Sequence, residues 1–377
     1  MAHKSTVRHP IFVSMFKASI HERDLKFSFD ARTSRGAIKR KRSWYLSLID
    51  QEQPDRVGYG ECGPLPGLSP EFEQVPAEME KAARWVEQQD PAEVSTAEAV
   101  RRLLAGSTWS SSVRLALEMA LLDWLNGGQR LVFHSPFATG DPVPINGLIW
   151  MGGVDFMLQQ VEIKIRDGFT CVKLKVGGND FEKECDVLQY IRRKYYKQDI
   201  IIRVDANGAF KPEDAPYKLK ELSRYGIHSI EQPLKKGAPA LAELCTQSPI
   251  PIALDEELIG VSSEQKASLL DQLKPAYLVL KPSLHGGFAG CREWIALAEQ
   301  RGMGWWITSA LESNVGLNAI AQFASQYPLN LPQGLGTGAI YENNIPSPLL
   351  AEKGYLTKRG WDEWDLSAIQ PAPSAET

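Results

Sequence analysis

The stretch CVKLKVGG, residues 171–178, has the strict alternation of a β-strand. Because successive side chains of a strand point to opposite faces, its lysines share one face and its apolar residues the other: Lys173 and Lys175; Val172, Leu174 and Val176. Such a strand is either an edge strand with a solvated lysine face, or a barrel strand whose lysines point inward. The next apolar run repeats the design, since Arg203 and Asp205 also share a face. This repetition favours a barrel.

Short apolar runs recur along the second half of the chain and alternate with helical stretches such as 180–195 and 212–226. A strand that alternates with a helix indicates a parallel sheet with crossover helices. About seven or eight such units in roughly 200 residues predict a (β/α) barrel. The predicted strands lie in 143–150, 171–176, 200–206, 229–233, 252–256, 277–282 and 304–309.

The first part of the chain has a different pattern. Residues 11–20, 41–50 and 57–63 are rich in β-branched and aromatic residues, which predicts a strand meander. Prolines and a glycine in 64–70 then predict a loop, and the pattern turns helical up to Trp124, with Gly127 and Gly128 as a stop signal. The tail 370–377 is expected to be disordered.

Composition narrows the function classes. The chain has 377 residues, of which 43% are hydrophobic and 23% charged, and these values are typical of a soluble globular protein. A net charge of −4 argues against nucleic acid as a partner. The five scattered cysteines indicate free thiols in a reducing compartment. Without a signal peptide or a long apolar run, we expect a cytoplasmic protein that does not enter a membrane.

A charged residue stands near the end of five predicted barrel strands. These residues are Lys175, Asp205, Glu231, Asp255 and Lys281, which are 30, 26, 24 and 26 residues apart. A barrel unit has about 25 to 30 residues, so the five occupy equivalent positions. The carboxyl ends of barrel strands meet at the mouth of the barrel, where active sites lie. We therefore expect these side chains to converge.

Three carboxylates in one pocket repel one another unless a cation neutralises them. Each acid alone would be read as a solvated loop carboxylate or a helix N-cap, but three at barrel spacing favour a shared site. Oxygen ligands of this kind suit a hard divalent metal. We therefore predict that Asp205, Glu231 and Asp255 bind Mg²⁺, with Mn²⁺ as an alternative.

The lysines suggest acid–base chemistry. A lysine serves as a general base only if its pKa falls toward neutrality, and a neighbouring ammonium and a divalent cation both lower it. We expect Lys175 to be the base and Lys173 to tune it, while Lys281 approaches the substrate from the opposite side. A base, an opposing cation and a metal suit abstraction of a proton next to a carboxylate, so the expected partner is a small carboxylate.

Five motifs occur in one order: KLK (173–175), DANG (205–208), EQP (231–233), LDE (254–256) and LKPSLHGG (280–287). With this order and spacing the sequence resembles the enolase superfamily, muconate-lactonizing subgroup. The resemblance implies an α/β fold, namely a modified (β/α)7β TIM-type barrel with an N-terminal α+β capping domain. The implied domains are residues 1–135 (cap), 136–345 (barrel) and 346–377, a C-terminal segment that returns to the cap. It also implies the metal ligands and lysine pair named above.

Within the subgroup the sequence is most similar to the o-succinylbenzoate synthase family, on residues 33–44, 58–69 and 308–324. The first two segments would be capping loops that close over the substrate, with Gly36 giving mobility and the basic residues attracting an anion. The third would present a helix N-terminus to a substrate carboxylate. The substrate-binding candidates are Ser309, Arg203, Asn207, Gly36 and Glu312.

The resemblance implies Mg²⁺-dependent syn dehydration of 2-succinyl-6-hydroxy-2,4-cyclohexadiene-1-carboxylate in menaquinone biosynthesis, through an enediolate. An N-succinylamino acid racemase or another racemase or epimerase of the subgroup is the alternative, because it uses the same lysines. A dipeptide epimerase is disfavoured because residues 333–345 lack its paired-aspartate motif. A non-catalytic barrel that only binds is disfavoured because no expected site residue is missing. The sequence does not determine the oligomeric state.

Overall fold

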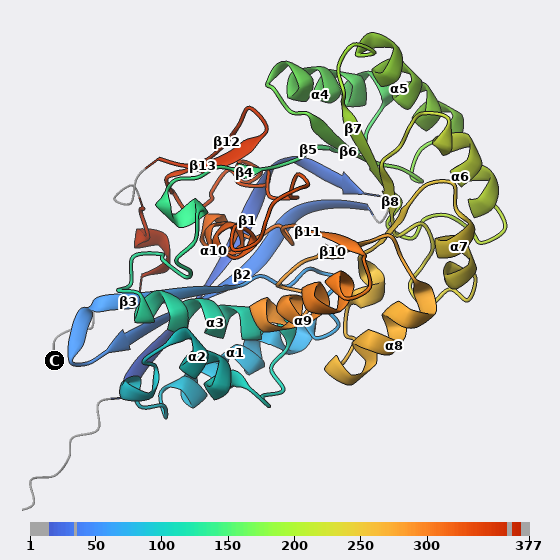
Figure 1. The fold of residues 1–377 in the computed structure, drawn as a ribbon. Helices are drawn as coiled ribbons and strands as arrows, with labels where there is room; N and C mark the ends of the chain where they lie inside the picture. The colour runs from blue at the N-terminus through green and yellow to red at the C-terminus, as the bar shows by residue number, and fades with distance from the viewer. Residues whose placement is uncertain (1–14, 34–35, 360–363, 371–377) are drawn as a thin grey trace, which may run out of the picture.

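The structure is a computed structural model that describes residues 15–33, 36–359 and 364–370 (Figure 1). Residues 371–377, where a disordered tail is expected, lie outside the described residues. Three strands, β1 (Phe16–Thr33), β2 (Gly36–Asp50) and β3 (Gln53–Cys62), form an antiparallel sheet in the order β1-β2-β3. Beside it lie α1 (Val75–Val86), α2 (Ala97–Leu104) and α3 (Ser111–Leu125).

The capping loops predicted over residues 33–44 and 58–69 are wrong for residues 36–44 and 58–62, which belong to strands β2 and β3, whereas the strands predicted in 41–50 and 57–63 are confirmed. In residues 36–44 the arginines face acidic side chains on β1, whereas Lys41 is buried and donates a hydrogen bond to Ser43. Arg40 contacts Asp24 and Arg42 contacts Glu22, both at 3.2 Å. The charges that suggested an anion-attracting loop therefore form exposed cross-strand pairs, and such pairs stabilise strand pairing modestly.

The sheet and α3 approach each other very closely, because glycines on β3 face the helix backbone. A Cβ atom added at Gly60 would lie 1.9 Å from the carbonyl oxygen of Ala116, and one added at Gly58 would lie 2.2 Å from that of Ala120. Only glycine permits this contact, so the sequence GYG in β3 is a packing feature.

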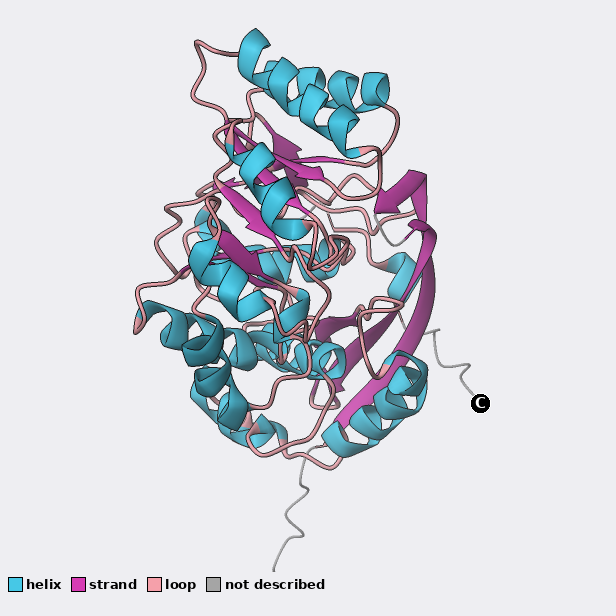
Figure 2. Ribbon diagram, turned by 90° about the vertical axis from the view of Figure 1, so that its right-hand side faces the viewer, coloured by secondary structure: helices cyan, strands magenta, loops and turns pink. Residues whose placement is uncertain are grey.

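Seven parallel strands form a second sheet in the order β11-β10-β9-β8-β7-β6-β5, with helices on its outer side (Figures 1 and 2). The seven predicted runs each contain one of these strands, so that prediction is confirmed. The strands are β5 (Gly147–Ile149), β6 (Cys171–Lys175), β7 (Ile201–Asp205), β8 (Ser229–Glu231), β9 (Ile252–Leu254), β10 (Tyr277–Leu280) and β11 (Gly304–Ile307). The helices are α4 (Val154–Arg166), α5 (Phe181–Lys194), α6 (Ala215–Ser223), α7 (Leu241–Gln247), α8 (Ser263–Leu273), α9 (Gly287–Glu299) and α10 (Asn314–Ala324).

Residues 333–334 join the two edges of this sheet. Gln333 pairs in parallel with Ile145, just before β5, and Gly334 pairs in parallel with Thr308, just after β11. Backbone hydrogen bonds of 2.7 to 3.0 Å support both pairings. The short segment thus acts as the eighth strand, and the predicted (β/α)7β barrel fold is confirmed.

The remaining described elements lie around these two units. Strands β12 (Leu349–Glu352) and β13 (Tyr355–Lys358) pair with β4 (Val143–Pro144), and the short helix η5 (Ser367–Ile369) lies against β1. The other 3-10 turns are η1 (Phe72–Gln74), η2 (Pro91–Glu93), η3 (Phe137–Thr139) and η4 (Glu256–Leu258). None of the helices in the described part of the chain is long and apolar enough to cross a membrane.

The close contact between β3 and α3 yields a first prediction. Gly60→Ala is expected to lower the free energy of unfolding by at least about 2 kcal/mol, because the added methyl group meets backbone that has no room to move. Gly153→Ala is the control, since Gly153 has a φ of −63° and nothing lies within 4 Å of the added Cβ. Urea denaturation measures both. Equal stability of the two variants would contradict the packing argument.

Candidate active site

Strand β6 points its lysines into the barrel. Val172, Leu174 and Val176 are buried in the main hydrophobic core, on the helix side of the strand. Lys173 and Lys175 lie on the opposite face and line a pocket at the mouth of the barrel. The alternation of lysines and apolar residues is therefore that of a barrel strand, with the lysines inside the barrel and the apolar residues toward the helices.

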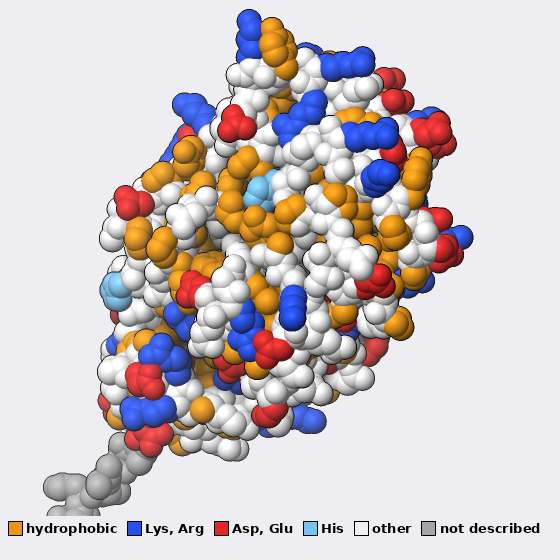
Figure 3. Space-filling view, turned by 45° about the vertical axis from the view of Figure 1, so that its right-hand side comes forward, with side chains coloured by type: hydrophobic (Ala, Val, Ile, Leu, Met, Phe, Trp, Pro, Cys, Tyr) orange, Lys and Arg blue, Asp and Glu red, His pale blue; other side chains and the backbone are white. Residues whose placement is uncertain are grey.

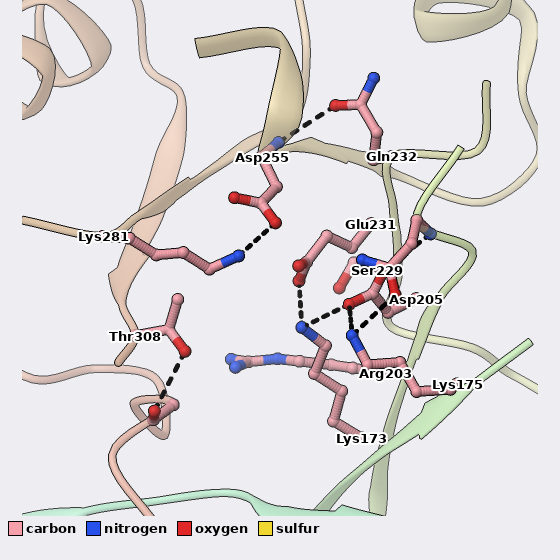
Figure 4. A network of polar contacts seen from close by, with 12 residues as sticks. Lys173, Lys175, Arg203, Asp205, Ser229, Glu231, Gln232, Asp255, Lys281 and Thr308 are labelled. Atoms are coloured by element: carbon pink, nitrogen blue, oxygen red, sulfur yellow. Dashed lines mark hydrogen bonds and ion pairs between the residues drawn. The ribbon is translucent and has the colours of Figure 1, made fainter. Parts of the chain in front are cut away.

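The inward lysines contact carboxylates from the next two strands of the sheet, β7 and β8 (Figure 4). The ammonium of Lys173 lies 2.5 Å from Glu231 and 2.8 Å from Asp205. Lys175 donates hydrogen bonds to Asp205 at 2.6 Å and to the side-chain oxygen of Asn207 at 2.9 Å. The strand register produces this arrangement, because Lys175 pairs with Asp205 and Asp205 pairs with Glu231.

A second group comes from the other side of the mouth (Figure 4). Lys281, directly after β10, forms an ion pair with Asp255, directly after β9. The side chain of Gln232 accepts a hydrogen bond from the backbone N–H of Asp255 at 3.2 Å, so it fixes the end of β9 against β8. The six charged residues expected at the strand ends and on strand β6 are thus brought together.

Burial and neighbouring charges shift these groups in opposite directions. Burial lowers the pKa of Lys175, and the ammonium of Lys173 lowers it further, against the opposing effect of Asp205. Burial also disfavours the charge of Lys173, but the carboxylates of Asp205 and Glu231 outweigh it and raise its pKa. Burial and the nearby Asp205 raise the pKa of Glu231 to about 8. The ammonium groups of Lys173 and Lys281 oppose this rise but do not cancel it.

Among the residues that the structure describes, no three acidic, histidine or cysteine side chains are gathered as a ready metal-binding group. The three acids instead turn oxygen atoms toward lysines, as described above. However, Glu231 Oε1 and Asp255 Oδ1 are buried without a hydrogen-bond partner. Two unpartnered carboxylate oxygens beside Asp205 form an all-oxygen donor set, which fits a hard divalent cation.

The pocket above this cluster has a volume of about 270 Å³. One part of its wall comes from the N-terminal sheet and the loop that follows it, the other from the barrel. The lining residues include Gly36, Ala37, Ile38, Leu65, Pro66, Gly67 and Leu68 from the first part, and Leu148, Trp150, Trp306 and Leu311 from the second. This wall is mostly apolar, so the pocket suits a ligand with a hydrophobic body.

The substrate-binding candidates separate into two sets. Asn207, Ser309 and Gly36 line the pocket, Gly36 as a strand residue with a φ of 121°. Arg203 lies inside the barrel, where it donates to the carbonyl of Pro332 at 2.8 Å, and is not among the lining residues. Glu312 is fully buried and accepts a hydrogen bond from Ser309 at 2.6 Å, so it reaches the pocket only through Ser309.

The start of α10 does not offer free N–H groups to a substrate, contrary to the expectation from residues 308–324. The carboxylate of Glu61, on β3, accepts hydrogen bonds from the backbone N–H groups of Ser313 and Gly316, both at 2.9 Å. Asn344 accepts the N–H of Asn314 at 2.9 Å. Because a carboxylate of the N-terminal sheet already occupies the positive end of the helix, α10 joins the two units.

Sequence reasoning did not single out several pocket residues. Asn146 and Trp150 belong to the run VPINGLIW, whose pattern predicts only a strand, and Thr337 follows the eighth strand. A polar residue inside an apolar run was the available signal for Asn146. No pattern marks Thr337, because it lies in an irregular segment.

Comparison with known proteins identifies the family. A sequence profile described as "Enolase C-terminal domain-like" matches residues 157–360. A protein named o-succinylbenzoate synthase, from Desulfotalea psychrophila, is 46% identical over 370 residues, covering 91% of this chain and 99% of the relative. The chain belongs to the enolase superfamily.

Solved structures of this superfamily agree with the fold. The crystal structure of MenC from Desulfotalea psychrophila superposes with a TM-score of 0.81 at 43% identity, covering 91% of this chain and all of that one. A dipeptide epimerase from Cytophaga hutchinsonii, complexed with Mg and a dipeptide, has a TM-score of 0.79 at 20% identity, covering 95% of this chain and 99% of that one. An N-succinylamino acid racemase from Amycolatopsis is 29% identical over 322 residues, which cover 82% of this chain and 84% of the relative.

The Glu61 contact yields a second prediction. Glu61→Ala is expected to lower the free energy of unfolding by on the order of 3 kcal/mol, because buried donors of α10 lose a charged acceptor. Glu73→Ala is the control, since Glu73 is exposed. Thermal and urea unfolding measure both. A loss no larger than that of the control would show that Glu61 does not hold the helix.

Proposed function

We propose that the chain is an o-succinylbenzoate synthase that converts 2-succinyl-6-hydroxy-2,4-cyclohexadiene-1-carboxylate to o-succinylbenzoate and water, a step of menaquinone biosynthesis. The observation that carries this proposal is the placement of two lysines, Lys175 and Lys281, on opposite sides of one pocket, with three buried carboxylates in contact with the pocket's lysines. The 46% identity to an o-succinylbenzoate synthase across 91% of the chain supports the substrate.

Lys175 is the proposed base. In its neutral form it takes the proton from the ring carbon that carries the carboxylate. The electron pair left on that carbon then forms a carbon–carbon double bond as the C–O bond of the neighbouring hydroxyl breaks. In a syn elimination both leaving groups lie on one face of the ring, so the ammonium of Lys175 returns its proton to the departing oxygen, which leaves as water. The ring becomes aromatic, and this stabilises the product.

The other charged groups support this role. A neutral Lys175 is favoured by burial and by the neighbouring Lys173, which stays charged because its ammonium contacts two carboxylates. Lys281 keeps its proton, since burial opposes but Asp255 outweighs it and raises its pKa. We propose that its ammonium stabilises the negative charge that develops on the substrate carboxylate during proton removal.

Asp205, Glu231 and Asp255 are the proposed ligands of Mg²⁺, or of Mn²⁺ as an alternative. When bound, the cation would supply positive charge to the substrate carboxylate and to the acid cluster. The two unpartnered carboxylate oxygens and the raised pKa of Glu231 support this assignment. The five cysteines, which are all free, support a reducing compartment such as the cytoplasm.

A racemase that acts on N-succinylamino acids is the second candidate. The same two lysines on opposite sides of the pocket would exchange a proton between two faces of the α-carbon. The Amycolatopsis racemase resembles this chain less than the Desulfotalea synthase does, at 29% against 46% identity. We therefore place dehydration first.

A paired assay tests the reaction. With Mg²⁺ present, we expect the purified protein to dehydrate the cyclohexadiene substrate quickly and to exchange the α-proton of N-succinylamino acids in D₂O slowly. Lys175→Ala is expected to lower kcat for dehydration by at least about 100-fold, because the base is lost. Lys183→Ala, at an exposed position on α5, is the control and should retain wild-type kcat. Fast exchange with weak dehydration would favour the racemase instead.

Calorimetric titration with Mg²⁺ tests the metal ligands without an activity assay. Wild-type protein is expected to bind the ion, and Glu231→Gln and Asp255→Asn should each weaken binding by at least about tenfold, since each removes a charged oxygen ligand. Asp186→Asn, on the exposed face of α5, is the control. Unchanged affinity in both acid variants would refute the assignment.

A further inference from the structure

Most polar side chains in the pocket wall already have hydrogen-bond partners. The hydroxyl of Thr308 donates to the carbonyl oxygen of Gly334 at 3.0 Å (Figure 4), and Ser309 donates to Glu312 at 2.6 Å. The wall's ammonium groups and one of its amides are held in the acid cluster: Lys173, Lys175, Lys281 and Asn207. These groups are therefore not free to take the rest of a ligand.

Two polar side chains in the wall differ from these. Asn146 Oδ1 and Thr337 Oγ1 are buried and have no hydrogen-bond partner, although the residues are only 4% and 6% exposed. A buried polar group without a partner costs about 1–3 kcal/mol, so folded proteins rarely keep one. Two in one pocket wall indicate groups that a ligand satisfies.

Their position follows from the strand order. Asn146 directly precedes β5, and Thr337 lies three residues beyond Gly334, the eighth-strand residue. Around the closed barrel, two strands lie between β5 and β8, and three lie between β8 and the eighth strand. Asn146 and Thr337 therefore lie across the barrel from Glu231 and Asp255, whereas Lys173 and Lys175 stand on β6, next to β5.

The wall between the two ends is apolar. Leu148, Trp150, Trp306 and Leu311 line the pocket on the barrel side, and no lysine or arginine among the described lining residues lies beyond the three of the acid cluster. The pocket thus has a charged end, a hydrophobic middle and a neutral polar end. A fitting ligand has a reacting carboxylate, an apolar ring or chain, and a distant group that accepts hydrogen bonds.

We propose that Asn146 and Thr337 form a second binding subsite that takes the oxygen atoms of an acyl side chain of the substrate, such as a succinyl chain. The hydroxyl of Thr337 donates to one of those oxygens. Turning the Asn146 amide over exchanges its Oδ1 and Nδ2 atoms, so that Nδ2 donates to another of the oxygens from the position that now has no partner. This inference rests on the proposed function for the position of the reacting carboxylate at the lysines. The subsite determines specificity and takes no part in proton transfer.

Calorimetric binding of two probes to Mg²⁺-loaded protein tests the subsite without turnover. o-Succinylbenzoate carries the succinyl chain, and benzoate lacks it. Wild-type protein is expected to bind o-succinylbenzoate at least about tenfold more tightly than benzoate. Asn146→Leu and Thr337→Val should each reduce this preference by about threefold to tenfold, the effect of one hydrogen bond, without changing the affinity for benzoate. Thr337→Ser, which keeps the hydroxyl, should retain the preference.

Stability and kinetics separate binding from a structural role. Because Thr337→Val removes an unpartnered polar atom at nearly constant shape, the thermal midpoint of the free protein should stay the same or rise. In the dehydration assay the variant should raise KM and leave kcat nearly unchanged. A lowered midpoint with an unchanged probe preference would overturn the proposal.

The remaining outcomes distinguish the two proposals. If wild-type protein bound both probes equally, the subsite would be wrong whether or not dehydration occurred. If it preferred o-succinylbenzoate, and the variants lost that preference, but no dehydration was found, the reaction would be wrong and the subsite would stand. An unchanged preference in both Asn146→Leu and Thr337→Val would refute the subsite alone.

Discussion

The balance of buried charge in the barrel mouth is the constraint on which the rest of the structure depends. Three carboxylates and three lysines are placed there by five consecutive strands, with almost no access to water. An isolated ion in such a place is strongly unfavourable, so each charge must contact an opposite one. The strand register achieves this, because Lys175, Asp205 and Glu231 stand at one level of the sheet. A shift by one residue would turn these groups toward the helices and destroy the cluster.

The N-terminal unit completes the site. It supplies the apolar side of the pocket, and it also supplies Glu61, whose carboxylate occupies the start of α10. Ser309 and Leu311, which line the pocket, lie in the turn just before that helix. The shape of the pocket therefore depends on a contact between two units that are far apart in sequence. On the face shown in Figure 3, positive and negative side chains are interspersed.

The barrel was predictable because its signal repeats. Each strand is a short apolar run, five of the seven runs carry a charged residue near the end, and a repeated pattern survives errors at any single strand. The start of β2, residues 36–40, was not predictable in the same way, since exposed basic residues on a strand look like a basic loop until the acidic residues that they contact on β1 are known. The partner of the α10 start is 252 residues away from Ser313. Such non-local contacts leave no periodic trace in the sequence.

The two ends of the pocket explain how one barrel serves different reactions. In the proposed function, a lysine on each side of the substrate carboxylate would permit both elimination and racemisation, since both begin with removal of an α-proton. The charged end of the site therefore defines the class of chemistry and does not select the substrate. Substrate selection must come from groups that contact the rest of the substrate. In this chain those groups are an apolar wall and the neutral polar atoms of Asn146 and Thr337. Because unpartnered polar atoms lower the stability of the free protein, their presence in an otherwise satisfied pocket is more readily explained by binding than by folding.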